Sequence, residues 1–106
     1  MCEIKFSPLA VSDLQEIRAY IAEELGSEQT AVNVLAKITK RIRELAKFPQ
    51  MGASLSAIVD FDTNYRFLVC GNYTAFYYFE NQIVHIVRIL YGRRDFMRIL
   101  FGEPED

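Results

Sequence analysis

The spacing of apolar residues predicts two helices in the first half of the chain. Ser7-Pro8 provides a serine that can cap a helix and a proline suited to the first helical position, and apolar side chains then recur every three or four residues until Gly26. Ser27 begins a second helix, which Pro49 ends. Because only Gly26 and Ser27 separate the helices, they should form an antiparallel hairpin. The apolar stripes are Leu14, Ile17, Ile21 and Leu25 in the first helix and Ala31, Val34, Leu35, Ile38, Ile42, Leu45 and Phe48 in the second.

Shorter apolar runs predict four strands. The first is Cys2 to Phe6, and the other three are Tyr65 to Cys70, Tyr73 to Glu80 and Ile83 to Tyr91. Only Gly71-Asn72 and Asn81-Gln82 separate the last three strands, so these should form an antiparallel meander with tight turns. Residues 50–64 have no clear period, which predicts a loop with one helical turn around Leu55 to Ile58. The pattern as a whole predicts an α+β fold in one domain, residues 1–106, with the first strand joined to the sheet of the meander.

The strand from Tyr73 to Glu80 is apolar or aromatic on both of its faces, which predicts a central strand covered on each side. The helical hairpin can cover one face. The tail from Arg94 to Asp106 is too short to cover the whole of the other face, so we expect an aromatic face that is left open for a partner. Tyr73, Tyr77 and Phe79 are the residues expected to form this surface.

The charge of the chain limits the classes of function. A net charge of −2 and a pI near 5.4 argue against a protein that coats nucleic acid through bulk positive charge. Basic residues nevertheless gather in two places, which could each receive an anionic or acidic partner. They are Lys37, Lys40, Arg41, Arg43 and Lys47 in the second helix and Arg88, Arg93, Arg94 and Arg98 near the end of the chain.

The cysteines and the start of the chain indicate a cytoplasmic protein. Cys2 and Cys70 are far apart in sequence and have no short spacing to the single histidine, His85, so no zinc site is expected and no cofactor is implied. Both cysteines lie in apolar strand contexts and are interpreted as small buried thiols. The sequence starts without a secretory leader pattern, and no run approaches the roughly 20 apolar residues of a membrane span.

Several motifs, taken in order, resemble the RelE/ParE family of toxins from bacterial toxin–antitoxin pairs. They are Ser7-Pro8, the run from Asp13 to Ile21 (Asp-Leu-x-x-Ile-x-x-Tyr-Ile), Pro49-Gln50-Met51-Gly52, Tyr65-Arg66, Gly71-Asn72-Tyr73 and the segment from Ile89 to Asp95. The resemblance covers almost the whole chain. It implies the toxin of a type II toxin–antitoxin system, held inactive by a cognate antitoxin in a hetero-oligomer.

The ribonuclease branch of this family implies one set of candidate residues. A metal-free ribonuclease needs a base, cations that hold the phosphate, and an acid for the leaving oxygen. Arg66 and Arg94 fall at cationic positions of the family pattern, and Tyr91 and His85 are the candidate base or acid. The set departs from the pattern, because Thr74 and Leu68 stand where cations are expected, and Leu100 and Phe101 stand where a terminal tyrosine is expected. For His85 a packing role is favoured over a catalytic one, since it alternates with Ile83, Val87 and Ile89 on one face of a strand.

The arginines near the end of the chain are candidates for contact with a target or an antitoxin. Arg88 lies among aliphatic residues of a strand and needs a partner, either a carboxylate such as Asp95 or a ligand. The run Arg93-Arg94-Asp95-Phe96-Met97-Arg98 is open to three interpretations: a solvated turn, a docking surface for the antitoxin, or a contact to an enzyme that acts on nucleic acid.

The resemblance to the ParE branch implies a toxin that binds DNA gyrase and traps its cleaved DNA complex, and the incomplete catalytic set favours this branch. The alternatives are a RelE-like, ribosome-dependent mRNA endonuclease and a toxin-fold relic that only binds an antitoxin. Whether the chain is an enzyme stays open at this stage.

Overall fold

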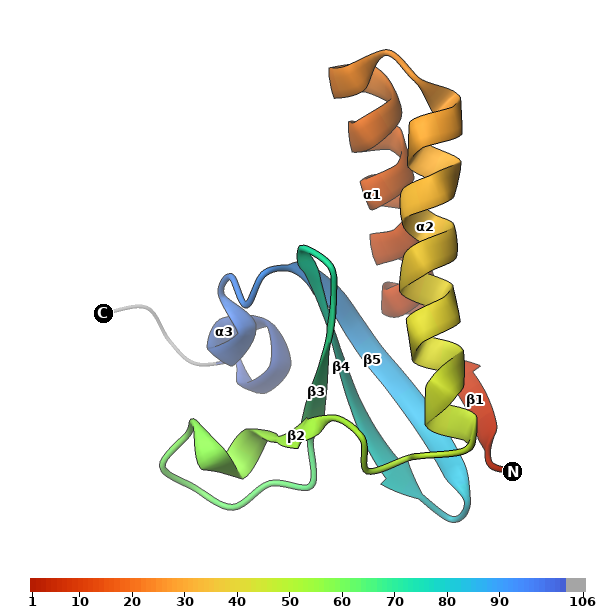
Figure 1. Ribbon diagram of the computed structural model, residues 1–106. Coiled ribbons are helices and arrows are strands. Elements are labelled where there is room, and N and C mark those ends of the chain that lie inside the picture. Colours follow the sequence, from red (N-terminus) through yellow and green to blue (C-terminus); the bar gives the residue numbers. More distant parts are fainter. Residues whose placement is uncertain (103–106) are drawn as a thin grey trace.

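The computed structural model describes residues 1–102 and forms an α+β fold, as the sequence pattern predicts (Figure 1). Residues 103–106, which end both the predicted domain and the predicted C-terminal tail, lie outside the described residues. Two long helices pack on one side of a sheet of five strands, and a short C-terminal helix lies on the other side. The elements are β1 (Glu3–Phe6), α1 (Pro8–Leu25), α2 (Glu28–Arg43), a 3₁₀ turn (Glu44–Ala46), β2 (Ala53–Ser54), a second 3₁₀ turn (Leu55–Ala57), β3 (Arg66–Cys70), β4 (Tyr73–Glu80), β5 (Ile83–Tyr91) and α3 (Phe96–Phe101).

The starts of both long helices and the end of α1 lie where the sequence predicts them, whereas α2 ends at Arg43 and a 3₁₀ turn follows in place of the helix expected to continue to Pro49. The Ser7 hydroxyl accepts a hydrogen bond from the Ala10 amide at 3.0 Å, and the Ser27 hydroxyl accepts one from the Thr30 amide at 3.1 Å. Gly26 ends α1 with a φ of 61°, a left-handed conformation that glycine adopts without strain. These local signals, and not the long-range packing, therefore define the helical hairpin.

The sheet has the strand order β1-β5-β4-β3-β2. Strands β3, β4 and β5 form the predicted antiparallel meander, and β1 joins β5 in parallel with Glu3 opposite Ile83. Asn81 and Gln82 both have a positive φ (54° and 64°), as the two central residues of a type I′ hairpin require. The short strand β2 was not predicted, because two residues carry no detectable period.

The core lies between the helical hairpin and one face of the sheet. Fully or almost fully buried side chains from α2 and the following turn meet side chains from β3, β4 and β5. They are Ile38, Ile42 and Leu45 on the helical side and Leu68, Ala75, Tyr77, Val84, Ile86 and Ile89 on the sheet side.

The opposite face of the sheet is more covered than the sequence suggests. Phe76 of β4 is completely buried, and its ring stacks on Phe96 of α3 with 5.7 Å between the ring centroids. The C-terminal segment therefore covers the centre of this face, although it is too short to cover all of it. Val69, which is 55% exposed, shows that the edge of the same face stays open.

The three residues expected to form an open aromatic surface point toward the core under the helices. Side chains alternate along a strand, and Tyr73, Tyr77 and Phe79 lie on the side of β4 that packs against the core under the helices. Tyr77 is 0% exposed. The prediction of an open surface made by these residues is wrong, because a sequence that is apolar on both faces does not indicate which face the hairpin covers.

Candidate functional site: a cleft between α1 and β5

A cleft of about 610 Å³ opens between α1, the end of β5 and the segment that follows β5. Its volume is in the range of sites that accept a small ligand or one or two side chains of a partner. The lining residues come from three parts of the chain: Asp13, Glu16, Ile17 and Tyr20 of α1; Tyr73, Arg88, Ile89, Leu90 and Tyr91 of the sheet; and Arg94 and Ile99 of the C-terminal segment.

A buried ion pair between Asp13 and Arg88 forms part of the cleft lining. Arg88 donates from Nε to Asp13 Oδ2 and from Nη2 to Asp13 Oδ1, each at 2.8 Å, and the Ile89 amide donates to Oδ2 at the same distance. The hydrogen bond to Asp13 raises the pKa of Arg88 above its ordinary value. The carboxylate that pairs with Arg88 is therefore Asp13, whereas Asp95 pairs with Arg98 at 3.3 Å.

Sequence reasoning missed Asp13, although a signal was present. Asp13 follows Ala10 by three residues and precedes Ile17 by four, so it falls on the buried side of α1. A carboxylate at such a position needs a buried cation, and Arg88 is the strand residue that needed an anion.

A β-bulge in β5 lies next to this ion pair. Phe76 is opposite Arg88 and Tyr77 is opposite Ile86, so Val87 is an extra residue in β5. The Ser7 hydroxyl donates to the Val87 carbonyl at 2.7 Å, and Asp13 accepts from the Ile89 amide. The side chains of Ser7 and Asp13 thus supply hydrogen-bond partners for main-chain groups near the bulge. These bonds hold the end of β5 in position beside the cleft.

Three tyrosines surround the cleft. Tyr20 and Tyr91 are 64% and 60% exposed, and the Tyr91 ring packs edge-on against Tyr73 at 5.6 Å. Burial, together with the neighbouring phenols of Tyr91 and Tyr20, raises the pKa of Tyr73 above 10.0. The Tyr73 phenol is therefore a poor base at physiological pH, whereas the ring faces and hydroxyls of the three tyrosines are suited to binding a partner.

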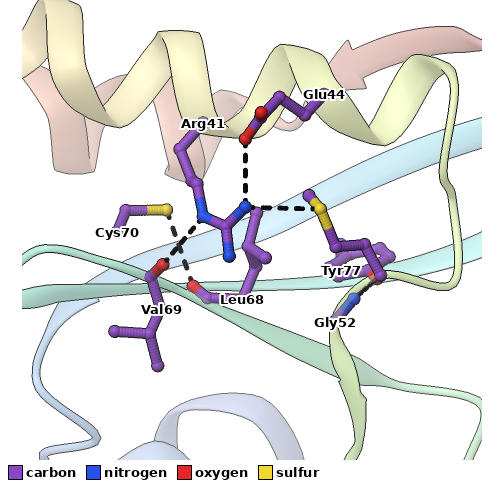
Figure 2. Close-up of polar contacts among 8 residues, drawn as sticks. Arg41, Glu44, Gly52, Leu68, Val69, Cys70 and Tyr77 are labelled. Atoms are coloured by element: carbon purple, nitrogen blue, oxygen red, sulfur yellow. Dashed lines mark hydrogen bonds and ion pairs between the residues drawn. The ribbon is translucent and has the colours of Figure 1, made fainter.

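Arg66, a candidate phosphate ligand, instead holds a turn of the chain. It donates from Nε to the Gly52 carbonyl at 3.0 Å and from Nη2 to the Gln50 carbonyl at 3.1 Å. In the same turn, the buried Tyr77 hydroxyl accepts from the Gly52 amide at 3.0 Å and donates to the Pro49 carbonyl at 2.9 Å (Figure 2 shows Gly52 and Tyr77). Arg66 and Tyr77 therefore fix the turn from Pro49 to Gly52.

His85 lies far from the cleft. Its ring stacks on Tyr78 at 4.6 Å, and six strand residues at about 3.3 Å each place it roughly 20 Å from Tyr91 along β5. Of the four candidate catalytic residues, the structure brings together only Tyr91 and Arg94. Arg93 is also separate from the cleft, since its guanidinium carbon lies 5.6 Å from the centre of the Phe67 ring.

A second polar cluster, around Arg41, lies at the edge of β3 (Figure 2). Arg41 donates to Glu44 Oε1 at 3.0 Å, to Met51 Sδ at 3.3 Å and, through Nε, to the Val69 carbonyl at 3.4 Å. The hydrogen bond to the Val69 carbonyl connects α2 to β3 at the open edge of the sheet. Beneath the cluster, burial raises the pKa of the Cys70 thiol to about 11, so this thiol is protonated and unreactive at neutral pH.

Residues 1–102 contain neither a membrane-spanning helix nor a group of side chains that could hold a metal ion. None of the helices there is long and apolar enough to cross a membrane. Within the same residues, histidine, cysteine and carboxylate side chains nowhere gather in groups of three that could hold a metal ion.

The order strand, helical hairpin and antiparallel meander defines a small α+β toxin fold, and comparisons with known proteins identify the family. Residues 4–96 match the family described as the ParE toxin of the type II toxin–antitoxin system parDE. The match spans most of the chain, which therefore belongs to the ParE family of the RelE/ParE superfamily, as the motifs predict. No curated protein sequence is significantly similar to it.

A solved structure confirms the fold. It is titled "Chromosomal ParDE TA system from P. aeruginosa" and superposes with a TM-score of 0.74 at 20% sequence identity. The alignment covers 87% of this chain and 97% of that one. The element order and the sheet are thus those of a ParE-like toxin.

Proposed function

We propose that this chain inhibits growth by binding DNA gyrase and trapping its cleaved DNA complex, and that a cognate antitoxin neutralises it. The observation that carries the proposal is an exposed cleft that is rich in binding side chains and holds only two of the four candidate ribonuclease residues, Tyr91 and Arg94. Tyr20, Tyr91 and Arg94 give it rings, hydroxyls and a cation, which are common in protein interfaces.

The positions of the candidate ribonuclease residues support binding over RNA cleavage. A base, an acid and the cations of a ribonuclease must lie within hydrogen-bond reach of one phosphate. Here Arg66 is held by two loop carbonyls, and His85 stacks on Tyr78 at the other end of β5. Only Tyr91 and Arg94 of the candidate set line the same cleft.

Exposed apolar side chains support an antitoxin as the second partner. Large apolar side chains of α1, of α2 and the segment that follows it, and of β3 are exposed to water: Leu9, Val11, Tyr20, Leu25, Val32, Phe48 and Val69. An antitoxin segment that folds over such residues would raise the apparent stability of the toxin by mass action. The reduced thiols of Cys2 and Cys70 are consistent with action in the cytoplasm, where both gyrase and messenger RNA are found.

Two assays with purified components test the proposal. Gyrase, ATP and supercoiled plasmid are incubated with the chain, and protein is then removed with detergent and protease. We expect linear plasmid that depends on both gyrase and toxin, and that disappears when the cognate antitoxin is added first. In parallel, a translation extract is examined for cut messages. Cleavage of ribosome-bound mRNA without DNA breaks would instead show that the chain is a RelE-like endonuclease. If neither assay shows an effect and antitoxin binding is retained, the chain is a toxin-fold relic that only binds an antitoxin.

A further inference from the structure

We propose that the cleft between α1 and β5 receives one arginine side chain of a protein partner, with the guanidinium held between tyrosine rings and the Glu16 carboxylate. The proposal deepens the proposed function, because it assumes a protein partner for this site and adds what that partner must present. Three features of the cleft support it: its aromatic walls, its free carboxylate, and the neutralised charge of Arg88.

The aromatic walls come from three separate elements. Tyr20 projects from α1, Tyr73 from the start of β4 and Tyr91 from the end of β5. Their phenols lie close enough to influence one another, since Tyr91 and Tyr20 both contribute to the raised pKa of Tyr73. The faces of such rings attract a cation, and several rings around one cavity are a known way to bind ammonium and guanidinium groups.

The charges of the cleft favour a cation near α1. Arg88 is neutralised by Asp13 through two hydrogen bonds of 2.8 Å, so neither group is available to a ligand. Glu16 lies one helical turn after Asp13 and one before Tyr20, and within residues 1–102 its carboxylate has no hydrogen bond or ion pair. A guanidinium can donate two parallel hydrogen bonds to this carboxylate while its flat face stacks on a ring.

Arg94 also lines the cleft and carries the charge opposite to that of Glu16. It belongs to the segment after β5, whereas Glu16 belongs to α1. Within the described residues Arg94 makes no ion pair with Glu16. The cleft therefore presents a carboxylate on one wall and a cation on the other. The aliphatic stem of the incoming arginine would pack on Ile17.

A titration with amino-acid amides tests the proposal directly. The chain is labelled with ¹³C in its tyrosine rings, and N-acetyl-arginine amide is added while the ring signals are followed by NMR. We expect Tyr20, Tyr73 and Tyr91 to shift on one binding curve, with a Kd on the order of millimolar for a probe of this size. Tyr65 and Tyr78, which belong to the aromatic cluster outside the cleft, serve as internal controls and should not shift.

Charge variants decide which group binds the probe. Glu16→Gln should weaken binding of the arginine amide about tenfold, because it removes a charge-assisted pair of hydrogen bonds. Glu80→Gln makes the same change at the exposed end of β4, away from the cleft, and should leave the Kd unchanged. Arg94→Gln should bind the probe as tightly as the parent chain or more tightly.

Three results would overturn the proposal. N-acetyl-norleucine amide binding as tightly as the arginine amide would show a merely apolar cleft. Tighter binding of N-acetyl-glutamate amide, abolished by Arg94→Gln, would show an anion site instead. No shift at Tyr20, Tyr73 and Tyr91 with any probe would show that the cleft binds none of these side chains. The gyrase assay is independent of this titration, so the proposed function can stand or fail separately.

Discussion

Replacement of Asp13 by asparagine should destabilise the fold more than any change at an exposed charge. The Asp13 carboxylate accepts three hydrogen bonds, two from Arg88 and one from the Ile89 amide, all at 2.8 Å. Asparagine has a similar size but only one acceptor oxygen, and its amide group would face a guanidinium that can only donate. The change leaves a buried cation without its counter-charge.

The size of the effect follows from the burial of the two side chains. Removal of one partner from a buried ion pair costs about 3–5 kcal/mol. The Asp13 side chain is 7% exposed and the Arg88 side chain is 21% exposed, so water can recover part of the solvation of Arg88. We therefore expect the lower end, about 3 kcal/mol. Domains of this size have a free energy of unfolding of about 5–15 kcal/mol, so the loss is a large fraction of the total.

Urea unfolding followed by far-UV circular dichroism measures this loss, since the chain contains no tryptophan for a fluorescence assay. With an m-value of about 1.5 kcal/mol/M, the midpoint should fall by about 2 M without a change in m. Glu16→Gln, an exposed carboxylate one turn later on α1, is the matched control and should change stability by less than about 0.5 kcal/mol. The double variant Asp13→Ala with Arg88→Ala should lose less than the sum of the two single losses.

A loss below about 1 kcal/mol for Asp13→Asn, or strict additivity in the double variant, would show that the pair does not stabilise the fold. A variant of the other partner, Arg88, connects the ion pair to function. Arg88→Ala should lower both stability and toxicity, because Arg88 shapes the cleft without being free to bind a target.

Three further predictions concern other parts of the molecule. Gly52→Ala should be strongly destabilising in thermal unfolding, because a Cβ there would lie 2.6 Å from the Phe67 carbonyl oxygen and 2.6 Å from the Tyr77 hydroxyl; a melting temperature equal to that of the parent chain would contradict it. Burial raises the pKa of Cys70 from 9.0 to about 11, so the folded state keeps the thiol proton at a pH where the unfolded chain loses it. The free energy of unfolding should therefore fall as the pH rises from 9 to 11. Cys70→Ala should reduce this fall, as measured by urea titrations at several pH values. Arg94→Ala combined with Arg93→Ala should leave the melting temperature nearly unchanged yet abolish growth inhibition at equal expression, and full toxicity of this variant would place the target site elsewhere.

The sequence alone determined the two long helices, four of the five strands and most of their boundaries, but neither the short strand β2 nor the helix α3. Capping by Ser7 and Ser27, the left-handed Gly26 and the Asn81-Gln82 turn are set by neighbouring residues, so they can be recognised without the fold. The ordered motifs likewise indicated the RelE/ParE family, because they span the whole chain and depend only on spacing.

The tertiary structure decided which side chains meet. Asp13 and Arg88 are 75 residues apart, and their pairing depends on how α1 crosses the bulge in β5. The face of β4 that the helices cover, and the use of Arg66 to hold a turn, depend in the same way on packing between distant segments. The local pattern of apolar and polar residues shows whether a segment is a helix or a strand, but not which other segments pack against it. The cleft exists only because three segments that are distant in sequence converge.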